Sequence, residues 1–367
     1  MSAPAKTTLK WVLGLGLGVL FIWLGASDWP LHVLFEHGVR LRGTVLDAGS
    51  WRFDWLYFAA YLAVLAVIHV LRVIRWAPLL RPLTQDAIDF PRLNRVSAVG
   101  FMYLFVLPFR LGELARPYLL AERGDVTMSQ VLATVVVERV VDGLVVSLAL
   151  FLVLFSLPST GNAATYFLEI QTGAWMALVI FAGALFVLGL AYWRRHLATR
   201  LIHGTFGRVS KGLADKLCGL VEQFFEGLGA FPKPGYLASF VGWTLVYWAV
   251  NGFGYWVLTK GFAHGSGAPF EVSLGAAYAM MCCVVVGMML PNPPANVGIY
   301  WYFLLKPLAL YGVVVGDPVA TAFGLAAWLA QLVQQSAFGL WYVARGGRAG
   351  ERYRVGPGTV GVPADVG

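Results

Sequence analysis

Apolar residues fall in long blocks along the chain, and short polar segments separate these blocks. An α-helix needs about 17 to 25 apolar residues to cross a hydrocarbon core about 30 Å thick. Blocks of this length predict six membrane-spanning helices, at residues 9–27, 55–74, 140–158, 173–193, 236–259 and 318–343. The pattern excludes a soluble globular fold and predicts an all-α, polytopic helical membrane protein.

Two further apolar stretches, 96–123 and 272–315, are interrupted by polar and helix-breaking residues. The first breaks between Pro108 and Glu113, so neither arm is long enough to span a bilayer. The second breaks between Pro291 and Gly298, where three prolines in four positions end a helix. We predict a re-entrant hairpin for the first stretch, and either a second hairpin or two tilted spans for the second.

The two breaks lie about half the chain apart, which predicts an inverted repeat. In transporters of this kind, broken helices from the two halves meet near the bilayer midplane and form the substrate site. The common occurrence of Pro and Gly in membrane helices is the plainer explanation. We expect one transmembrane domain, with a first half at 1–193, a cytoplasmic connector at 194–235 and a second half at 236–345. A disordered cytoplasmic tail is expected at 346–367.

Positive charges between the spans predict the orientation in the membrane. The segments 72–95 and 194–216 and the residues after 344 are rich in arginine or lysine, whereas the loops 159–172 and 261–271 contain neither. Basic loops stay in the cytoplasm. We therefore predict a multi-pass protein of the cytoplasmic membrane with both termini inside. The first helix is expected to be retained, with a cleaved signal peptide as the alternative.

Composition supports the membrane assignment and narrows the chemistry. Of 367 residues, 59% are hydrophobic and 13% are charged, against about 25% charged residues in soluble domains. The net charge of +8 is spread between apolar blocks, so it indicates membrane topology and no nucleic-acid partner. The sequence contains no phosphate-binding loop of the GxxxxGK[ST] type and no metal-binding motif, so we expect no cofactor and no metal.

A cluster of charges around the first break is the main candidate for function. Arg110, Glu113 and Arg116 are followed by a second group, in which Glu138 and Asp142 lie four residues apart on one helix face beside Arg139. Charges at membrane depth are costly unless they are paired or line a wet cavity. Arg116 is our candidate for phosphate binding, because a guanidinium makes two parallel bonds to phosphoryl oxygens. The alternative is a set of ion pairs that only locks the hairpin to the next helix.

Other polar residues are weaker candidates. We include Arg75, next to the basic end of the second span, and Asn292 and Asn296 from the second break in the candidate substrate site. For Arg72 and Arg75 the alternative is an interfacial anchor. The remaining polar residues within spans are expected to make hydrogen bonds that hold the helices together; they are His69, Asn251, Gln331, Gln334 and Gln335.

Three motifs are informative together: Arg75-Trp76, the run from Arg110 to Leu120, and Val137-Glu138-Arg139-Val140-Val141-Asp142. They resemble the lysylphosphatidylglycerol synthase transmembrane region family, whose members are often called flippase-like proteins. The resemblance implies a helical fold with re-entrant segments that translocates phospholipids or lipid-linked intermediates. Bifunctional members carry a cytoplasmic aminoacyl transferase domain, which we do not expect here. At Pro294 to Gly298 the sequence departs from the family pattern Pro-Gly-Gly-x-Gly and lacks the acidic residue that follows it.

We therefore expect no enzyme but a protein that flips an anionic phospholipid or a lipid-linked phosphate intermediate across the cytoplasmic membrane. Its partners would be membrane lipids with anionic headgroups, together with a second copy of the chain or a protein of cell-envelope biosynthesis. The alternatives are a membrane-embedded enzyme acting on a lipid-linked phosphate or glycan, and a non-catalytic scaffold in surface-polymer synthesis. Under the first expectation, Arg116→Ala impairs lipid handling more than Arg72→Ala.

Overall fold

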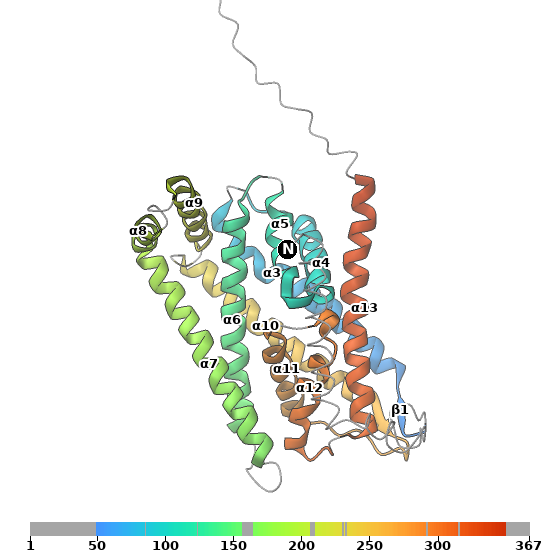
Figure 1. Ribbon diagram of the computed structural model, residues 1–367. Coiled ribbons are helices and arrows are strands. Elements are labelled where there is room, and N and C mark those ends of the chain that lie inside the picture. The colour runs from blue at the N-terminus through green and yellow to red at the C-terminus, as the bar shows by residue number, and fades with distance from the viewer. Residues whose placement is uncertain are drawn as a thin grey trace, which may run out of the picture.

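The computed structural model describes residues 49–84, 86–122, 124–155, 164–205, 210–229, 231, 233–290, 293–314 and 316–349. The predicted first span at 9–27 and the predicted tail lie outside these residues, except for the tail's first four positions. The described part is mostly helical (Figure 1).

Five long helices cover the remaining predicted spans: α3 (Trp55–Leu80), α6 (Met128–Phe155), α7 (Ala164–Trp193), α10 (Pro234–Thr259) and α13 (Pro318–Ala349). Two stretches in the described part, Trp55–Leu83 and Phe167–Trp193, are long and apolar enough to span a membrane. Helix α6 begins twelve residues before the predicted 140, because hydropathy marks only the apolar part. The charged turn at Glu138 and Arg139 continues the helix, since both side chains have ion-pair partners.

The first broken stretch consists of α4 (Phe90–Val106), the 3-10 helix η2 (Pro108–Leu114) and α5 (Ala115–Ala121). Leu107 is extended, the conformation favoured before a proline, and it ends α4. The chain then returns along α4. A Cβ on Gly112 would lie 2.1 Å from the Leu104 backbone nitrogen, and one on Gly100 would lie 2.3 Å from Cγ of Arg116. Glycine at both positions therefore permits the close return.

The second broken stretch consists of α11 (Leu274–Met288), η5 (Pro294–Asn296), α12 (Ile299–Leu305) and η6 (Lys306–Tyr311). Ala295 and Asn296 have φ of 55°, so the backbone takes the left-handed conformation at the predicted break. The indole nitrogen of Trp328 donates to the Ala295 carbonyl at 2.8 Å, which supports this turn. Helix α12 packs on α11. At about 1.5 Å per residue, the 15 residues of α11 fall short of a 30 Å hydrocarbon core.

A small sheet departs from the all-α prediction. Strand β1 (Trp51–Phe53) pairs antiparallel with β2 (Phe262–His264), with Phe53 opposite Phe262. Strands of three residues are too short to show an alternating pattern in the sequence. The sheet ties the start of α3 to the end of α10, and the backbone N–H of Asp54 donates to the Gly261 carbonyl beside it at 2.8 Å.

The two parts of the chain pack against each other along their lengths. Helix α3 lies against α10, α4 against α13, and α6 against α11. The amphipathic helices α8 (Arg195–Thr205) and α9 (Lys211–Gly227) pack together at one end, next to α6 and α7 (Figure 1). Apolar residues form two buried cores, one around α10, α11 and α13 and one around α4, α5, α6 and the end of α3. The charged cluster lies where these helices meet.

Candidate functional site

Arg75 on α3 is held by two carboxylates of α6. Its guanidinium donates to Glu138 Oε1 at 2.7 Å and to the two oxygens of Asp142 at 2.5 and 2.9 Å. All three side chains are buried. Glu138 and Asp142 share one face of α6, as their spacing predicts, so this part of the network follows from the sequence. The indole of Trp248 donates to Asp142 at 3.0 Å and brings α10 into the same network.

Arg116 on α5 also joins this network, and its side chain is buried, with 3% of its surface exposed. Its Nη1 donates to Glu138 Oε2 at 2.9 Å, while the guanidinium carbon lies 4.0 Å from the ring centre of Trp76 and 4.9 Å from that of Phe101. Glu138 is therefore shared between Arg75 and Arg116. The arrangement holds α5 against α3 and α6.

Arg139 and Arg110 extend the network toward the break in the first half. Arg139 donates to Glu138 at 2.8 Å and lies 3.6 Å from Asp142 and 3.9 Å from Glu113. Arg110 pairs with Glu113 and also donates to the Met288 carbonyl at the end of α11. Arg110 has φ of 56°, an uncommon backbone conformation for a side chain of this size. Through the Met288 carbonyl, Arg110 links the first break to the end of α11.

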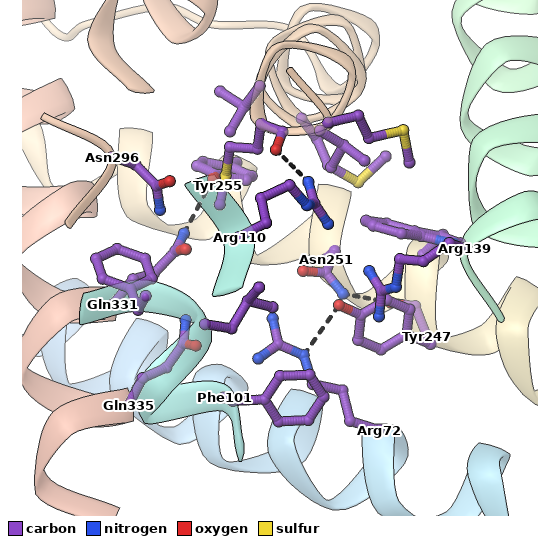
Figure 2. Close-up of a pocket in the computed structure, with 18 of the residues that line it drawn as sticks. Arg72, Phe101, Arg110, Arg139, Tyr247, Asn251, Tyr255, Asn296, Gln331 and Gln335 are labelled. Carbon is purple, nitrogen blue, oxygen red and sulfur yellow. Dashed lines mark hydrogen bonds between the residues drawn. The ribbon is translucent and has the colours of Figure 1, made fainter. Parts of the chain in front are cut away.

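A cavity of about 100 Å³ opens beside these residues, between the two halves of the fold. The arginines that line it are Arg72 and Arg75 from α3, Arg110 from η2 and Arg139 from α6. Figure 2 shows Arg72, Arg110 and Arg139 approaching one space from three different elements. Glu113, Arg116, Glu138 and Asp142 do not line it. The carboxylates of the network thus lie behind the arginines, as seen from the cavity.

Arg72 differs from the other lining arginines in its partners. Its Nε donates to the Tyr247 hydroxyl at 3.0 Å, and its guanidinium carbon lies 4.6 Å from the ring centre of Phe101. In the described part of the chain it has no ion pair with a carboxylate. The sequence favoured an interfacial anchor for Arg72 and left it out of the candidate site, although Arg72 lies three residues before Arg75 on the same face of α3.

Amide side chains also line the cavity: Asn296, Gln331 and Gln335 lie on one side of it, and Asn251 lies near Arg139 and Tyr247 (Figure 2). Asn251 donates to the Tyr247 carbonyl of its own helix at 2.7 Å, and among the described residues its side chain makes no hydrogen bond to another helix. Gln331 does join helices. Its amide nitrogen lies 3.2, 3.0 and 2.9 Å from the hydroxyls of Tyr61, Tyr255 and Tyr300, which come from α3, α10 and α12.

Most of the predicted site residues therefore lie in one connected region. Arg75, Arg110, Arg139 and Asn296 line the cavity, while Glu113, Arg116, Glu138 and Asp142 support the lining arginines from behind. Asn292 lies outside the described residues. Sequence reasoning missed Arg72, Asn251, Gln331 and Gln335 as lining residues. His69 is structural, as expected, because it bonds to Asn94 at 2.9 Å between α3 and α4.

The chemistry available at the cavity is that of an anion-binding site. Guanidinium groups make short, charge-assisted hydrogen bonds to phosphate oxygens. The described lining residues include no serine, threonine, cysteine, histidine or carboxylate. Within the described ranges, no group of three or more His, Cys, Asp or Glu side chains could hold a metal ion.

A family model described as the lysylphosphatidylglycerol synthase TM region matches residues 11–339. No further domain is matched. No curated protein and no solved structure matches the chain. The matched range contains every residue of the charged network and of the cavity lining. The chain therefore belongs to the lysylphosphatidylglycerol synthase TM region family, and it is an integral, multi-pass membrane protein.

Proposed function

We propose that the protein translocates an anionic phospholipid or a lipid-linked phosphate intermediate across the cytoplasmic membrane. The observation that carries this proposal is the convergence of Arg72, Arg110 and Arg139 on one cavity between the two halves of the fold. Arginines inside a membrane domain are costly, and such groups mark substrate paths. A phosphate in the cavity would accept hydrogen bonds from all three.

The size of the cavity supports binding of the headgroup alone. Its volume of about 100 Å³ is below the roughly 300 to 1,000 Å³ of sites that enclose drug-sized ligands. The acyl or prenyl chains would therefore remain in the hydrocarbon core of the bilayer, so they need not be transferred to water or to the protein. Large apolar side chains exposed along α7, such as Val179 and Phe186, are consistent with contact with lipid.

The packing of the helices supports an inverted repeat as the basis of movement. If the two halves are repeats of each other, α3 corresponds to α10, α4 to α11, α5 to α12 and α6 to α13. Such a repeat requires α3 to pack against its own counterpart α10, and it requires the α4–α13 contact to be matched by a contact between α11 and α6. Both are observed. We infer that both broken stretches are re-entrant and that one opens from each side of the membrane. Rocking of one half against the other would expose the cavity alternately.

The bond from Arg110 to the Met288 carbonyl would be the contact that changes during this cycle. It joins the break of the first half to the helix end of the second half. Arg110 also lines the cavity, so an incoming phosphate competes with the carbonyl for its donors. Binding of the headgroup would in this way loosen the contact between the halves. We keep the predicted orientation, with both termini in the cytoplasm, as part of the proposal.

Reconstitution into liposomes tests the function. Labelled phospholipids with anionic and zwitterionic headgroups are followed for exchange between leaflets and for chemical integrity. Exchange of intact anionic lipid supports translocation. A chemically changed lipid would indicate a membrane-embedded enzyme, and intact lipid without exchange would indicate a scaffold. Either of these two results contradicts the proposal.

A further inference from the structure

The charges around the cavity do not balance, and the imbalance bears on the ligand. Five arginines meet there: Arg72, Arg75, Arg110, Arg116 and Arg139. Three carboxylates pair with them: Glu113, Glu138 and Asp142. Within the described part of the chain, the group therefore carries an excess of two positive charges. Unneutralised charge inside a membrane protein is costly, because little water reaches it.

The positions of the groups direct this excess toward the cavity. Glu138 and Asp142 are fully buried behind Arg75 and Arg139, and no carboxylate is among the described lining residues. Arg72, which has no carboxylate partner in the described ranges, faces the cavity. The uncompensated charge thus lies where a ligand would enter.

We propose that the site takes a phosphate group with two negative charges, that is, a lipid phosphomonoester or diphosphate, in preference to a phosphodiester with one. This inference rests on the proposed function and names its substrate class. A dianion neutralises the excess completely, whereas a diester leaves one positive charge. A headgroup that carries an amine would meet arginines and amides, with no acidic side chain in the described lining to receive it.

The remaining lining groups fit this ligand. Arg72 and Arg110 come from opposite sides of the cavity in Figure 2, so separate oxygens of one phosphate can receive them. The amides of Gln335 and Asn251 offer neutral donors and acceptors beside the charge. The ligand's phosphate would face Arg72, Arg110 and Arg139 together with the phenols of Tyr247 and Tyr255.

Calorimetric binding to the purified full chain in detergent tests the inference. The probes are short-chain phosphatidic acid, a monoester, and phosphatidylglycerol and phosphatidylethanolamine with the same chains. At pH 7.5 we expect phosphatidic acid to bind about tenfold or more tightly than phosphatidylglycerol, since one added charge lies a few ångströms from the excess. Phosphatidylethanolamine should bind most weakly.

The pH dependence and three variants sharpen the test. The second ionisation of a phosphomonoester has a pKa of about 6, so the preference should shrink toward unity at pH 5. Phosphatidylglycerol keeps its single charge over this range and corrects for titration of the protein. Arg72→Gln should abolish the preference, and Arg72→Lys should keep it. Arg95→Gln removes an exposed arginine of α4 outside the cavity and should also keep it.

Equal affinities at pH 7.5, tighter binding of phosphatidylglycerol, absence of binding by both lipids, or an unchanged preference in Arg72→Gln would each overturn the inference. The two proposals fail separately. Tight binding of phosphatidic acid without exchange in liposomes would leave the inference standing and refute translocation. Exchange of phosphatidylglycerol in liposomes without a binding preference for the monoester would support translocation and refute the inference about the substrate.

Discussion

The guanidinium of Arg75 meets both oxygens of Asp142, at 2.5 and 2.9 Å, with all these atoms buried between α3, α6 and α10. Arg75 also donates to Glu138, one turn earlier on α6. These bonds fix the rotation of α6 against α3. They also place Arg139, the neighbour of Glu138, at the cavity.

Removal of Arg75 should therefore destabilise the fold. Arg75→Ala removes a guanidinium that bonds to both buried carboxylates, although Arg139 still pairs with each of them, so we expect a loss of about 3 kcal/mol, the lower end of the range for breaking a buried ion pair. We expect a clear fall in the thermal unfolding midpoint of the protein in detergent. A midpoint equal to that of the wild type would show that the network does not hold α3 to α6.

Substitutions of Arg116 and Arg72 should affect different properties of the protein, stability for Arg116 and lipid handling for Arg72. Arg116 supports Glu138 from behind and does not line the cavity, whereas Arg72 lines it. Contrary to the order expected from sequence, Arg72→Gln should reduce lipid handling with little loss of stability. The main effect of Arg116→Ala should be a lower unfolding midpoint. Measuring both quantities for both variants separates the roles, and equal losses of lipid handling at unchanged stability would contradict this assignment.

The glycine at the first return should tolerate no side chain. A Cβ at Gly112 would clash with the backbone of α4, where no rotamer change can relieve it. Gly112→Ala should cost about 1 to 3 kcal/mol or more and impair folding of the hairpin. Gly183→Ala on α7 is the control, because nothing lies within 4 Å of the position that its Cβ would take. Similar unfolding midpoints for the two variants would argue against the close return of the chain.

Gln331 should contribute to stability through its three tyrosine contacts. Gln331→Leu removes this amide. The hydroxyls of Tyr255 and Tyr300 keep the 2.8 Å hydrogen bond to each other, whereas the Tyr61 hydroxyl loses its bond to the amide, and an unsatisfied buried group costs about 1 to 3 kcal/mol. We expect a lower unfolding midpoint than that of Val333→Leu, a change at an exposed position of the same helix. The prediction fails if both variants unfold at the wild-type midpoint.

Several features could be predicted from sequence because they depend on local patterns. Apolar length placed the long helices, and proline and glycine placed both breaks. The spacing of Glu138 and Asp142 predicted a shared face on α6. These features need only the helix period and the conformational limits of proline.

Other features depend on contacts between distant segments, and for this reason the sequence did not show them. Arg72 and Arg116 are both arginines in the sequence, and only the packing of α3, α4 and α5 decides which of them reaches the cavity. The bond from Arg110 to Met288 joins residues 178 positions apart. The pairing of β1 with β2 likewise joins two distant segments of the chain that carry no strand pattern of useful length.

The most direct test of translocation through this cavity is the rate of leaflet exchange of a labelled anionic lipid in liposomes containing wild-type protein, Arg72→Gln, Arg72→Lys or Arg95→Gln. We predict that Arg72→Gln slows exchange at least about tenfold, as expected from the loss of a charge-assisted hydrogen bond to phosphate. Arg72→Lys should retain part of the rate, and Arg95→Gln all of it. Exchange by Arg72→Gln at the wild-type rate, in protein of wild-type stability, would contradict the account.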